Sequence, residues 1–192
     1  MINYPNGKAP LSIKTKKATA LKGGLANRGM NFEAAINRAN AYYVAENRAI
    51  ITKRPTPIRI VKVDYSHGAH ITDAYFEKQS TADYNGVYRG KYLDFETKST
   101  QAKTSFPLAN ITAHQIAHLS GVIEHGGIAF FLIDFAVRQE IFLLDASFVI
   151  ECYRFSNRRS ITYQTIKEKG FLVPEKINPA IDYLAIVDQV YF

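Results

Sequence analysis

Tyr92-Leu93-Asp94-Phe95-Glu96-Thr97-Lys98 is a run in which apolar side chains alternate with charged ones. A period of two is typical of a β-strand, because successive side chains of a strand point to opposite faces of the sheet. The apolar members would share one face, and Asp94, Glu96 and Lys98 the other. Glu96 and Lys98 would then lie side by side, about 7 Å apart along the backbone.

The segments around this run predict the rest of a sheet. A turn at Asp83-Tyr84-Asn85-Gly86 and a strand starting at Val87 would pair with it as a hairpin. Residues 111–124 have apolar side chains at helical spacing, and Gly126-Gly127 would end that helix. Residues 128–135 are almost continuously apolar, as in a central strand covered on both faces, and residues 140–144 offer a neighbouring strand. We therefore expect an α/β fold, a mixed central β-sheet flanked by helices. Residues 182–192 suit a helix or a strand.

The N-terminal part divides into three. Residues 1–26 mix Gly, Pro, Lys, Ala and Thr without a period, so we expect a flexible basic N-terminal segment ahead of a single domain, residues 27–192. A helix is predicted from Asn31, a good N-cap residue, to about Asn47. Residues 58–65 and 71–77 read as strands on either side of a turn at 66–70, and about residues 62–75 would project from the domain as a β-hairpin stalk.

The charge favours a polyanionic partner. The chain has 24 Lys and Arg against 17 Asp and Glu, a formal net charge of +7, and residues 1–32 contain no acidic residue. Nucleic acid is a natural partner for such a surface, although a solubilising surface is the alternative. The single cysteine, Cys152, excludes an internal disulfide and points to a reducing compartment. The sequence has neither a membrane-length apolar run nor a signal peptide, so we expect a cytoplasmic protein.

The polar face of the run suggests metal-assisted phosphodiester hydrolysis. A carboxylate such as Glu96 can ligate Mg²⁺, and the ammonium of Lys98 can stabilise charge that develops on a phosphate. Asp83, on the first arm of the hairpin, can supply a second carboxylate. Glu-x-Lys alone is a weak motif, because the same residues form an ordinary ion pair on many exposed strands.

Several further motifs occur in order along the chain, and together they resemble the RecU-type Holliday junction resolvases of the PD-(D/E)xK nuclease superfamily. The resemblance covers essentially the whole chain. It is carried by Tyr4-Pro5-Asn6-Gly7-Lys8, Asn27-Arg28-Gly29-Met30, Lys53-Arg54-Pro55-Thr56-Pro57, Ala74-Tyr75-Phe76, Ser80-Thr81-Ala82-Asp83-Tyr84-Asn85-Gly86, Tyr92-Leu93-Asp94-Phe95-Glu96-Thr97-Lys98, Thr104-Ser105-Phe106-Pro107-Leu108, His114-Gln115-Ile116 and Asp182-Tyr183.

This resemblance implies a restriction-endonuclease-like fold and a cytoplasmic homodimer that nicks two symmetric strands of a four-way DNA junction with Mg²⁺, for which Mn²⁺ is a possible substitute. It places metal ligands at Thr81, Asp83, Glu96 and Gln115, and a transition-state stabiliser at Lys98. The stalk would enter the junction centre. Recombination proteins are possible partners.

The chain departs from the pattern in two places. Ala82 stands where the superfamily has proline, and the segment from Ser66 to Ile71 has two histidines but no Lys or Arg. The second departure leaves the stalk's own DNA contacts open.

Other positions have roles that residue type leaves open. Arg28, Lys53 and Arg54 are candidates for contacts to the DNA backbone. Glu33 is either an accessory carboxylate of the site or a favourable charge near a helix N-terminus. Asp94 shares the face of Glu96 but can equally pair with Lys91, so it is left out of the metal set.

Three alternatives concern site residues. Thr81 on residue type alone would cap a turn, and Gln115 would be an exposed helix residue. His114 and His118 have zinc-site spacing, but a histidine pair without a metal is favoured.

Two other functions remain open at this point. One is a non-catalytic DNA-binding module, in which Asp83, Glu96 and Lys98 only stabilise the hairpin. The other is a restriction-type nuclease that acts on ordinary duplex DNA.

Overall fold

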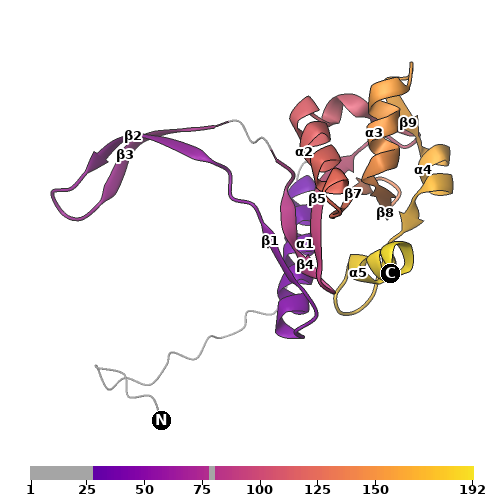
Figure 1. The fold of residues 1–192 in the computed structure, drawn as a ribbon, viewed down its shortest axis with the longest axis horizontal. Helices are drawn as coiled ribbons and strands as arrows, with labels where there is room; N and C mark the ends of the chain where they lie inside the picture. Colours follow the sequence, from indigo (N-terminus) through magenta and orange to yellow (C-terminus); the bar gives the residue numbers. More distant parts are fainter. Residues whose placement is uncertain (1–27, 78–80) are drawn as a thin grey trace, which may run out of the picture.

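In the computed structural model, which describes residues 28–77 and 81–192, the run around Glu96 lies in the middle of a six-stranded sheet (Figure 1). In chain order the elements are α1 (Arg28–Ala45), β1 (Ile50–Lys53), β2 (Ile58–Asp64), β3 (His70–Phe76), β4 (Tyr84–Tyr88), β5 (Lys91–Thr100), β6 (Ser105–Pro107), the 3-10 helix η2 (Leu108–Asn110), α2 (Ala113–Glu124), β7 (Ile128–Phe135), β8 (Glu140–Asp145), α3 (Ala146–Phe155), β9 (Ser160–Thr162), α4 (Tyr163–Lys169), β10 (Phe171–Leu172) and α5 (Tyr183–Tyr191).

The sheet is mixed, as the sequence predicts. Its strand order is β1-β4-β5-β7-β8-β10, and β5 and β7 are its parallel pair, whereas the other neighbours are antiparallel. The parallel pair is joined through α2, since parallel neighbours need a long crossover connection. Every residue of β7 is buried, as expected for a central strand with helices on both faces.

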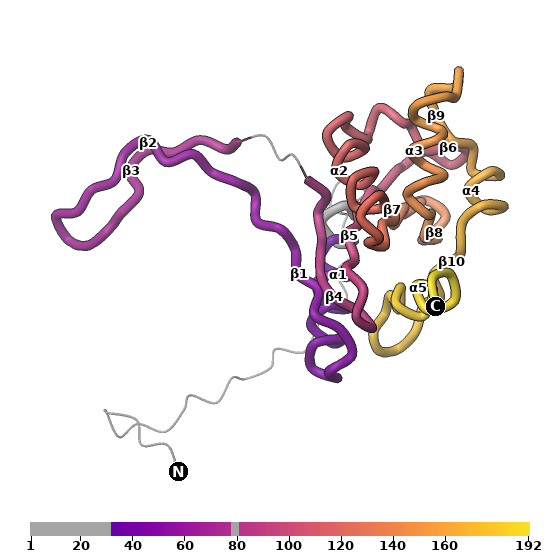
Figure 2. The backbone as a smooth tube through the Cα atoms, in the orientation of Figure 1, coloured from indigo at the N-terminus to yellow at the C-terminus, as the bar shows by residue number. Residues whose placement is uncertain are grey.

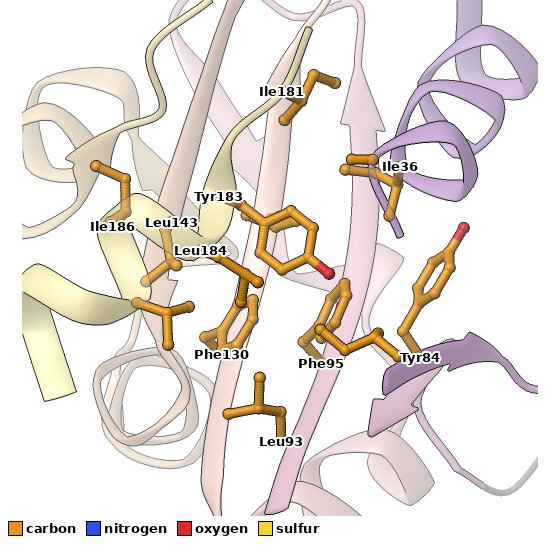
Figure 3. Close-up of a cluster of buried hydrophobic side chains, with 14 of the residues drawn as sticks. Ile36, Tyr84, Leu93, Phe95, Phe130, Leu143, Ile181, Tyr183, Leu184 and Ile186 are labelled. Carbon is orange, nitrogen blue, oxygen red and sulfur yellow. The ribbon is translucent and has the colours of Figure 1, made fainter. Parts of the chain in front are cut away.

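Two apolar clusters cover the two faces of this sheet. On one face, α1 and α5 pack on aromatic residues of three adjacent strands. The Phe95 ring is stacked between Tyr84 and Phe130, with ring centroids 5.0 and 4.6 Å apart (Figure 3). On the other face, α2, α3 and α4 pack on the neighbouring strand residues, such as Phe131 and Leu144. The expected fold class, a mixed sheet flanked by helices, is confirmed.

The alternation along β5 decides which side holds the polar residues. Phe95 belongs to the cluster under α1 and α5, so its neighbours Asp94 and Glu96 turn to the side of α2. In the parallel register, Glu96 is paired with Phe131. Polar side chains of β5 and α2 are thus brought together above a rigid apolar layer.

Two local expectations are corrected. The first helix begins at Arg28 rather than Asn31, so Asn31 is not its N-cap. The predicted turn at 83–86 is wrong, because Tyr84 begins strand β4 and Gly86 pairs with Ile51 of β1. A Cβ on Gly86 would lie 2.1 Å from the backbone oxygen of Ile50. Glycine therefore serves the close approach of two strands at this position and not a turn.

The stalk is a two-stranded antiparallel hairpin of β2 and β3 that extends away from the sheet (Figure 2). Its strands match the two predicted ones to within a residue, although the hairpin begins earlier than the stalk predicted at about residues 62–75. Arg59 and Lys62 lie in β2 and are exposed, which corrects the expectation of a stalk without basic residues. The predicted N-terminal segment, residues 1–26, lies outside the described residues.

The C-terminal segment forms the helix α5, which settles the choice that the sequence left open. Among the described residues, no helix is long and apolar enough to cross a membrane.

Candidate active site

Glu96 is the centre of the polar cluster between β5 and α2. Its side chain is 1% exposed. Its Oε1 accepts hydrogen bonds from Lys98 Nζ at 2.7 Å and from Gln115 Nε2 at 2.6 Å. Its Oε2 accepts a hydrogen bond from the backbone N–H of Asp83 at 3.1 Å. Four of the residues that the sequence singles out are thus in one place.

Asp83 approaches this cluster from the segment that leads into β4. Its Oδ2 accepts hydrogen bonds from the backbone N–H of Thr97 at 3.1 Å and from Thr97 Oγ1 at 2.9 Å. Thr97 is therefore an anchor for the second carboxylate, a role that the sequence does not reveal. Because Asp83 donates to Glu96 and accepts from Thr97, its backbone and carboxylate are both tied to β5.

The electrostatics of Glu96 are unusual for a carboxyl group. Burial raises the pKa of Glu96 from its ordinary value of 4.5 to about 7, and the negative charge of Asp83 adds to this rise. The ammonium of Lys98 lowers the pKa and offsets part of the increase. The negative charge of Glu96 is therefore under-compensated by the protein's own groups.

Gln115 is held by the capping box at the start of α2. The Gln115 backbone N–H donates to Thr112 Oγ1, and the Gln115 Oε1 accepts from the backbone N–H of Thr112 at 3.0 Å. This cap directs the amide nitrogen toward Glu96. To ligate a cation through its amide oxygen, Gln115 would have to turn and exchange the cap for the ion.

The other predicted positions are Thr81, Glu33 with Lys53, and Arg28. Thr81 is half-buried and precedes Asp83 by two residues. Glu33 forms an ion pair with Lys53 at the protein surface, away from the contacts of Glu96. Arg28 begins α1, and its side chain lies outside the described part of the chain.

A second polar cluster adjoins the first and is built on Asp94. The guanidinium of Arg54 donates to both carboxylate oxygens of Asp94, at 2.9 and 2.6 Å. His118 Nε2 and the Tyr92 hydroxyl donate to Oδ2, at 2.8 and 3.0 Å. The alternative pairing with Lys91 is wrong, because positions three apart on a strand face opposite sides of the sheet. The polar alternation of β5 was the only signal for this cluster.

The donor chemistry of the first cluster fits a hard divalent cation. Carboxylate, hydroxyl and amide oxygens are the groups that Mg²⁺ prefers. Burial disfavours the negative charge of Glu96, and a cation beside the carboxylate would compensate for that charge. Within residues 28–77 and 81–192, no group of three or more His, Cys, Asp or Glu side chains could hold a metal ion, so only two carboxylates contribute here. His118 is engaged with Asp94, and His114 is exposed.

A mixed sheet that carries an Asp and a Glu-x-Lys on the face covered by a crossover helix is the arrangement that the sequence resemblance implies for a nuclease. Residues 27–189 match the family described as "RecU: Recombination protein U". The chain is 48% identical over 197 residues to the Holliday junction resolvase RecU of Bacillus cytotoxicus, covering 100% of this chain and 98% of that protein. It is 46% identical over 196 residues, with the same coverage, to the Holliday junction resolvase RecU of Geobacillus kaustophilus.

This chain belongs to the RecU family, as its motifs predict. Among solved structures, Hjc of Archaeoglobus fulgidus, a Holliday junction resolvase, matches with a TM-score of 0.45 and 12% identity. That match covers 75% of this chain and 95% of Hjc.

Proposed function

We propose that this chain is a metal-dependent endonuclease that resolves four-way (Holliday) DNA junctions by paired symmetric nicks, in recombination and repair. The observation that carries the chemistry is the buried Glu96, in contact with Lys98, Gln115 and the backbone of Asp83. The choice of substrate rests on family membership, because the relatives that match over full length are named Holliday junction resolvases.

The metal in this proposal is Mg²⁺, with Mn²⁺ as a substitute, held by Thr81, Asp83, Glu96 and Gln115. When bound, such a cation polarises the scissile phosphate and lowers the pKa of a coordinated water. The protein's own contribution is orientation: Thr97 fixes the Asp83 carboxylate, and Lys98 and the Asp83 N–H fix that of Glu96.

Lys98 has a second task in the proposed reaction. Its Nζ lies 2.7 Å from Glu96 Oε1, and its side chain is 21% exposed, so it can reach both the buried carboxylate and an incoming phosphate. An ammonium at this place stabilises the charge that develops on the phosphate oxygens. Removal of Lys98 would therefore slow the chemical step more than it would weaken DNA binding.

Two further features belong to the proposal. Two symmetric nicks are most simply made by a homodimer with two equivalent sites. The stalk would enter the junction centre, and Lys53, with Arg28, would contact the backbone. A single, half-buried Cys152 is consistent with a reducing, cytoplasmic location.

A paired assay tests this function and its alternatives. A synthetic four-way junction and a linear duplex of the same sequence are incubated with the protein in Mg²⁺, and then with chelator. Selective, chelator-sensitive cleavage of the junction is expected. Equal cleavage of both substrates would instead identify a duplex nuclease, and binding without any cleavage would identify a DNA-binding module.

Glu96→Gln links the assay to the site. We expect this variant to bind the junction but to cleave it about 100 to 1000 times more slowly, the scale for loss of one preorganised electrostatic group. Glu46→Gln, which changes an exposed carboxylate at the end of α1, is the matched control and should cleave normally.

A further inference from the structure

Arg54 stands where the stalk joins the sheet. The stalk has two legs, residues 54–57 leaving β1 and residues 77–83 returning to β4, of which 78–80 lie outside the described part. The legs are hydrogen-bonded near the hairpin, from the Glu77 N–H to the Pro57 oxygen at 2.9 Å. They meet again at Arg54, whose backbone N–H donates to the Asp83 oxygen at 2.8 Å.

The Arg54 side chain adds a second attachment to the returning leg. Its Nη1 donates to the backbone oxygen of Ala82 at 3.0 Å, next to the carboxylate residue Asp83. The same guanidinium donates to both oxygens of Asp94, which is fully buried and lies two residues before Glu96 on the same face of β5. One side chain thus joins the outgoing leg, the returning leg and the strand of Glu96.

The partners of Arg54 leave its fork little capacity for DNA. Its Nη2 donates to Tyr92 Oη and to Asp94 Oδ2, and its Nη1 to Ala82 and to Asp94 Oδ1, which accounts for all four N–H groups of the two terminal nitrogens. The side chain is 18% exposed. A phosphate contact would therefore require breaking bonds to a buried carboxylate, which is costly.

The Arg54–Asp94 pair, with its bond to the Ala82 oxygen, is called the clamp below, and it also contacts α2. His118 donates to Asp94, and Gln115, one turn earlier in α2, donates to Glu96. Asp94 and Glu96 are therefore connected both along β5 and through α2. A shift of Asp94 would move the strand and the helix that together hold Glu96.

We propose that Arg54 is a positioning residue, which with Asp94 fixes the legs of the stalk and the Asp83–Glu96 pair in one geometry. This positioning role replaces the DNA-backbone contact expected for Arg54 from the sequence. The inference rests on the proposed metal site and nuclease activity. A lysine cannot make the two-pronged contact, so Arg54→Lys keeps the charge and removes the geometry.

The test compares Arg54→Lys, Asp94→Asn and the double variant with wild type. Arg89→Lys is the matched control, because Arg89 forms a single, exposed ion pair with Asp188 at 3.0 Å. Three quantities are measured for protein that is folded by circular dichroism: Mn²⁺ affinity without DNA, junction affinity, and the single-turnover cleavage rate. Tyr92→Phe, which removes one hydroxyl donor to Asp94, is the milder variant if Asp94→Asn does not fold.

We expect Arg54→Lys to cleave about 10 to 100 times more slowly, since small misplacements of reacting groups have effects of this size. Asp94→Asn should match it, and the double variant should be no slower, because both changes break one unit. Mn²⁺ affinity should fall in the three variants and stay unchanged in Arg89→Lys, while junction affinity stays within about threefold, which is well under 1 kcal/mol.

Three outcomes would overturn the inference. Unchanged Mn²⁺ affinity with a lower melting temperature would make the clamp merely structural. Weaker junction binding with a smaller salt dependence in Arg54→Lys alone would make Arg54 a phosphate contact. Variants that cleave at the wild-type rate would show that Arg54 and Asp94 have no part in positioning the site. A wild type that leaves junctions intact would instead refute the proposed function, and the Mn²⁺ titration would still decide on the clamp.

Discussion

The strand β5 and the stalk hairpin β2–β3 are both β structure, yet they are stabilised in different ways. The core of β5 is buried between two helical layers, whereas almost every residue of β2 and β3 is exposed on both faces. An isolated two-stranded hairpin is at best marginally stable in water. The comparison teaches that the proposed reacting groups lie on a buried strand, whereas the projecting hairpin is held mainly by its backbone ladder and by a few side-chain hydrogen bonds such as that from Thr72 Oγ1 to the Lys62 oxygen.

The sharpest contrast is expected between two phenylalanines. Phe95→Ala removes a ring stacked between two others in the core and should lower the free energy of unfolding by about 3 to 5 kcal/mol. Phe76→Ala removes a ring that is 79% exposed and should change it by less than about 0.5 kcal/mol. Urea unfolding of both variants measures the difference. A similar decrease in the free energy of unfolding for both variants would mean that Phe76 is buried against another surface in solution.

The second prediction concerns how the free energy of unfolding depends on pH through Glu96, which lies in β5. The pKa of Glu96 is raised from 4.5 to about 7 in the folded protein. Between these values the folded protein keeps a proton that the unfolded chain has lost, so the free energy of unfolding falls as the pH rises. The shift corresponds to roughly 3 kcal/mol, lost by about pH 8 in metal-free protein.

Urea unfolding in chelator at pH 5 and pH 8 measures this loss. Glu96→Gln should remove most of the pH dependence, and Mg²⁺ should restore stability to wild type at pH 8. Glu46→Gln should behave as wild type. A wild type with equal stability at both pH values would contradict the raised pKa.

The third prediction tests whether the stalk is needed for the fold. Replacement of residues 58–76 by a short Gly-Ser linker should leave the melting temperature of the domain within a few degrees, because the stalk buries little of the core. Junction affinity should fall about tenfold, or roughly 1.4 kcal/mol, with duplex affinity nearly unchanged. An unfolded product would show that the hairpin stabilises the sheet.

The smallest effect is expected at the basic residues of the stalk. Changing Arg59 and Lys62 together to Ala should weaken junction binding a few-fold and reduce the salt slope of binding by about two, one unit for each lost phosphate contact. Changing Lys167 and Lys169 to Ala, at the far end of the domain in α4, is the control with equal charge. Equal losses in both double variants would point to net charge rather than to the stalk.

Local patterns predicted the sheet well. Strand β7 has the bounds that its apolar run indicates, and the alternation in β5 separates Phe95 from Glu96 as expected. Gln115 lies beside Glu96, where residue type alone predicted an exposed helix residue and only the family resemblance placed it with Glu96. The two strand features follow from periodicity and from short connections, which a sequence displays directly.

What the sequence did not predict depends on contacts between distant residues. Arg54 and Asp94 are 40 positions apart, and no spacing rule connects them. Tyr84 was read as part of a turn because Asn85-Gly86 is typical of one, whereas the approach of β1 is the reason for the glycine. The sequence predicts no element for residues 146–181, where the structure has the helices α3 and α4. The roles of the predicted ligands stay a prediction.

Gly86 has a consequence for how mutations spread through this molecule. A methyl group at this position would push β1 away from β4. β1 ends at Lys53, and the outgoing leg of the stalk begins at the next residue. A shift of β1 would therefore rotate the whole hairpin about its base. A small displacement of β1 would become a larger displacement at the tip of the stalk. The direction of the hairpin therefore depends on the absence of a side chain at Gly86.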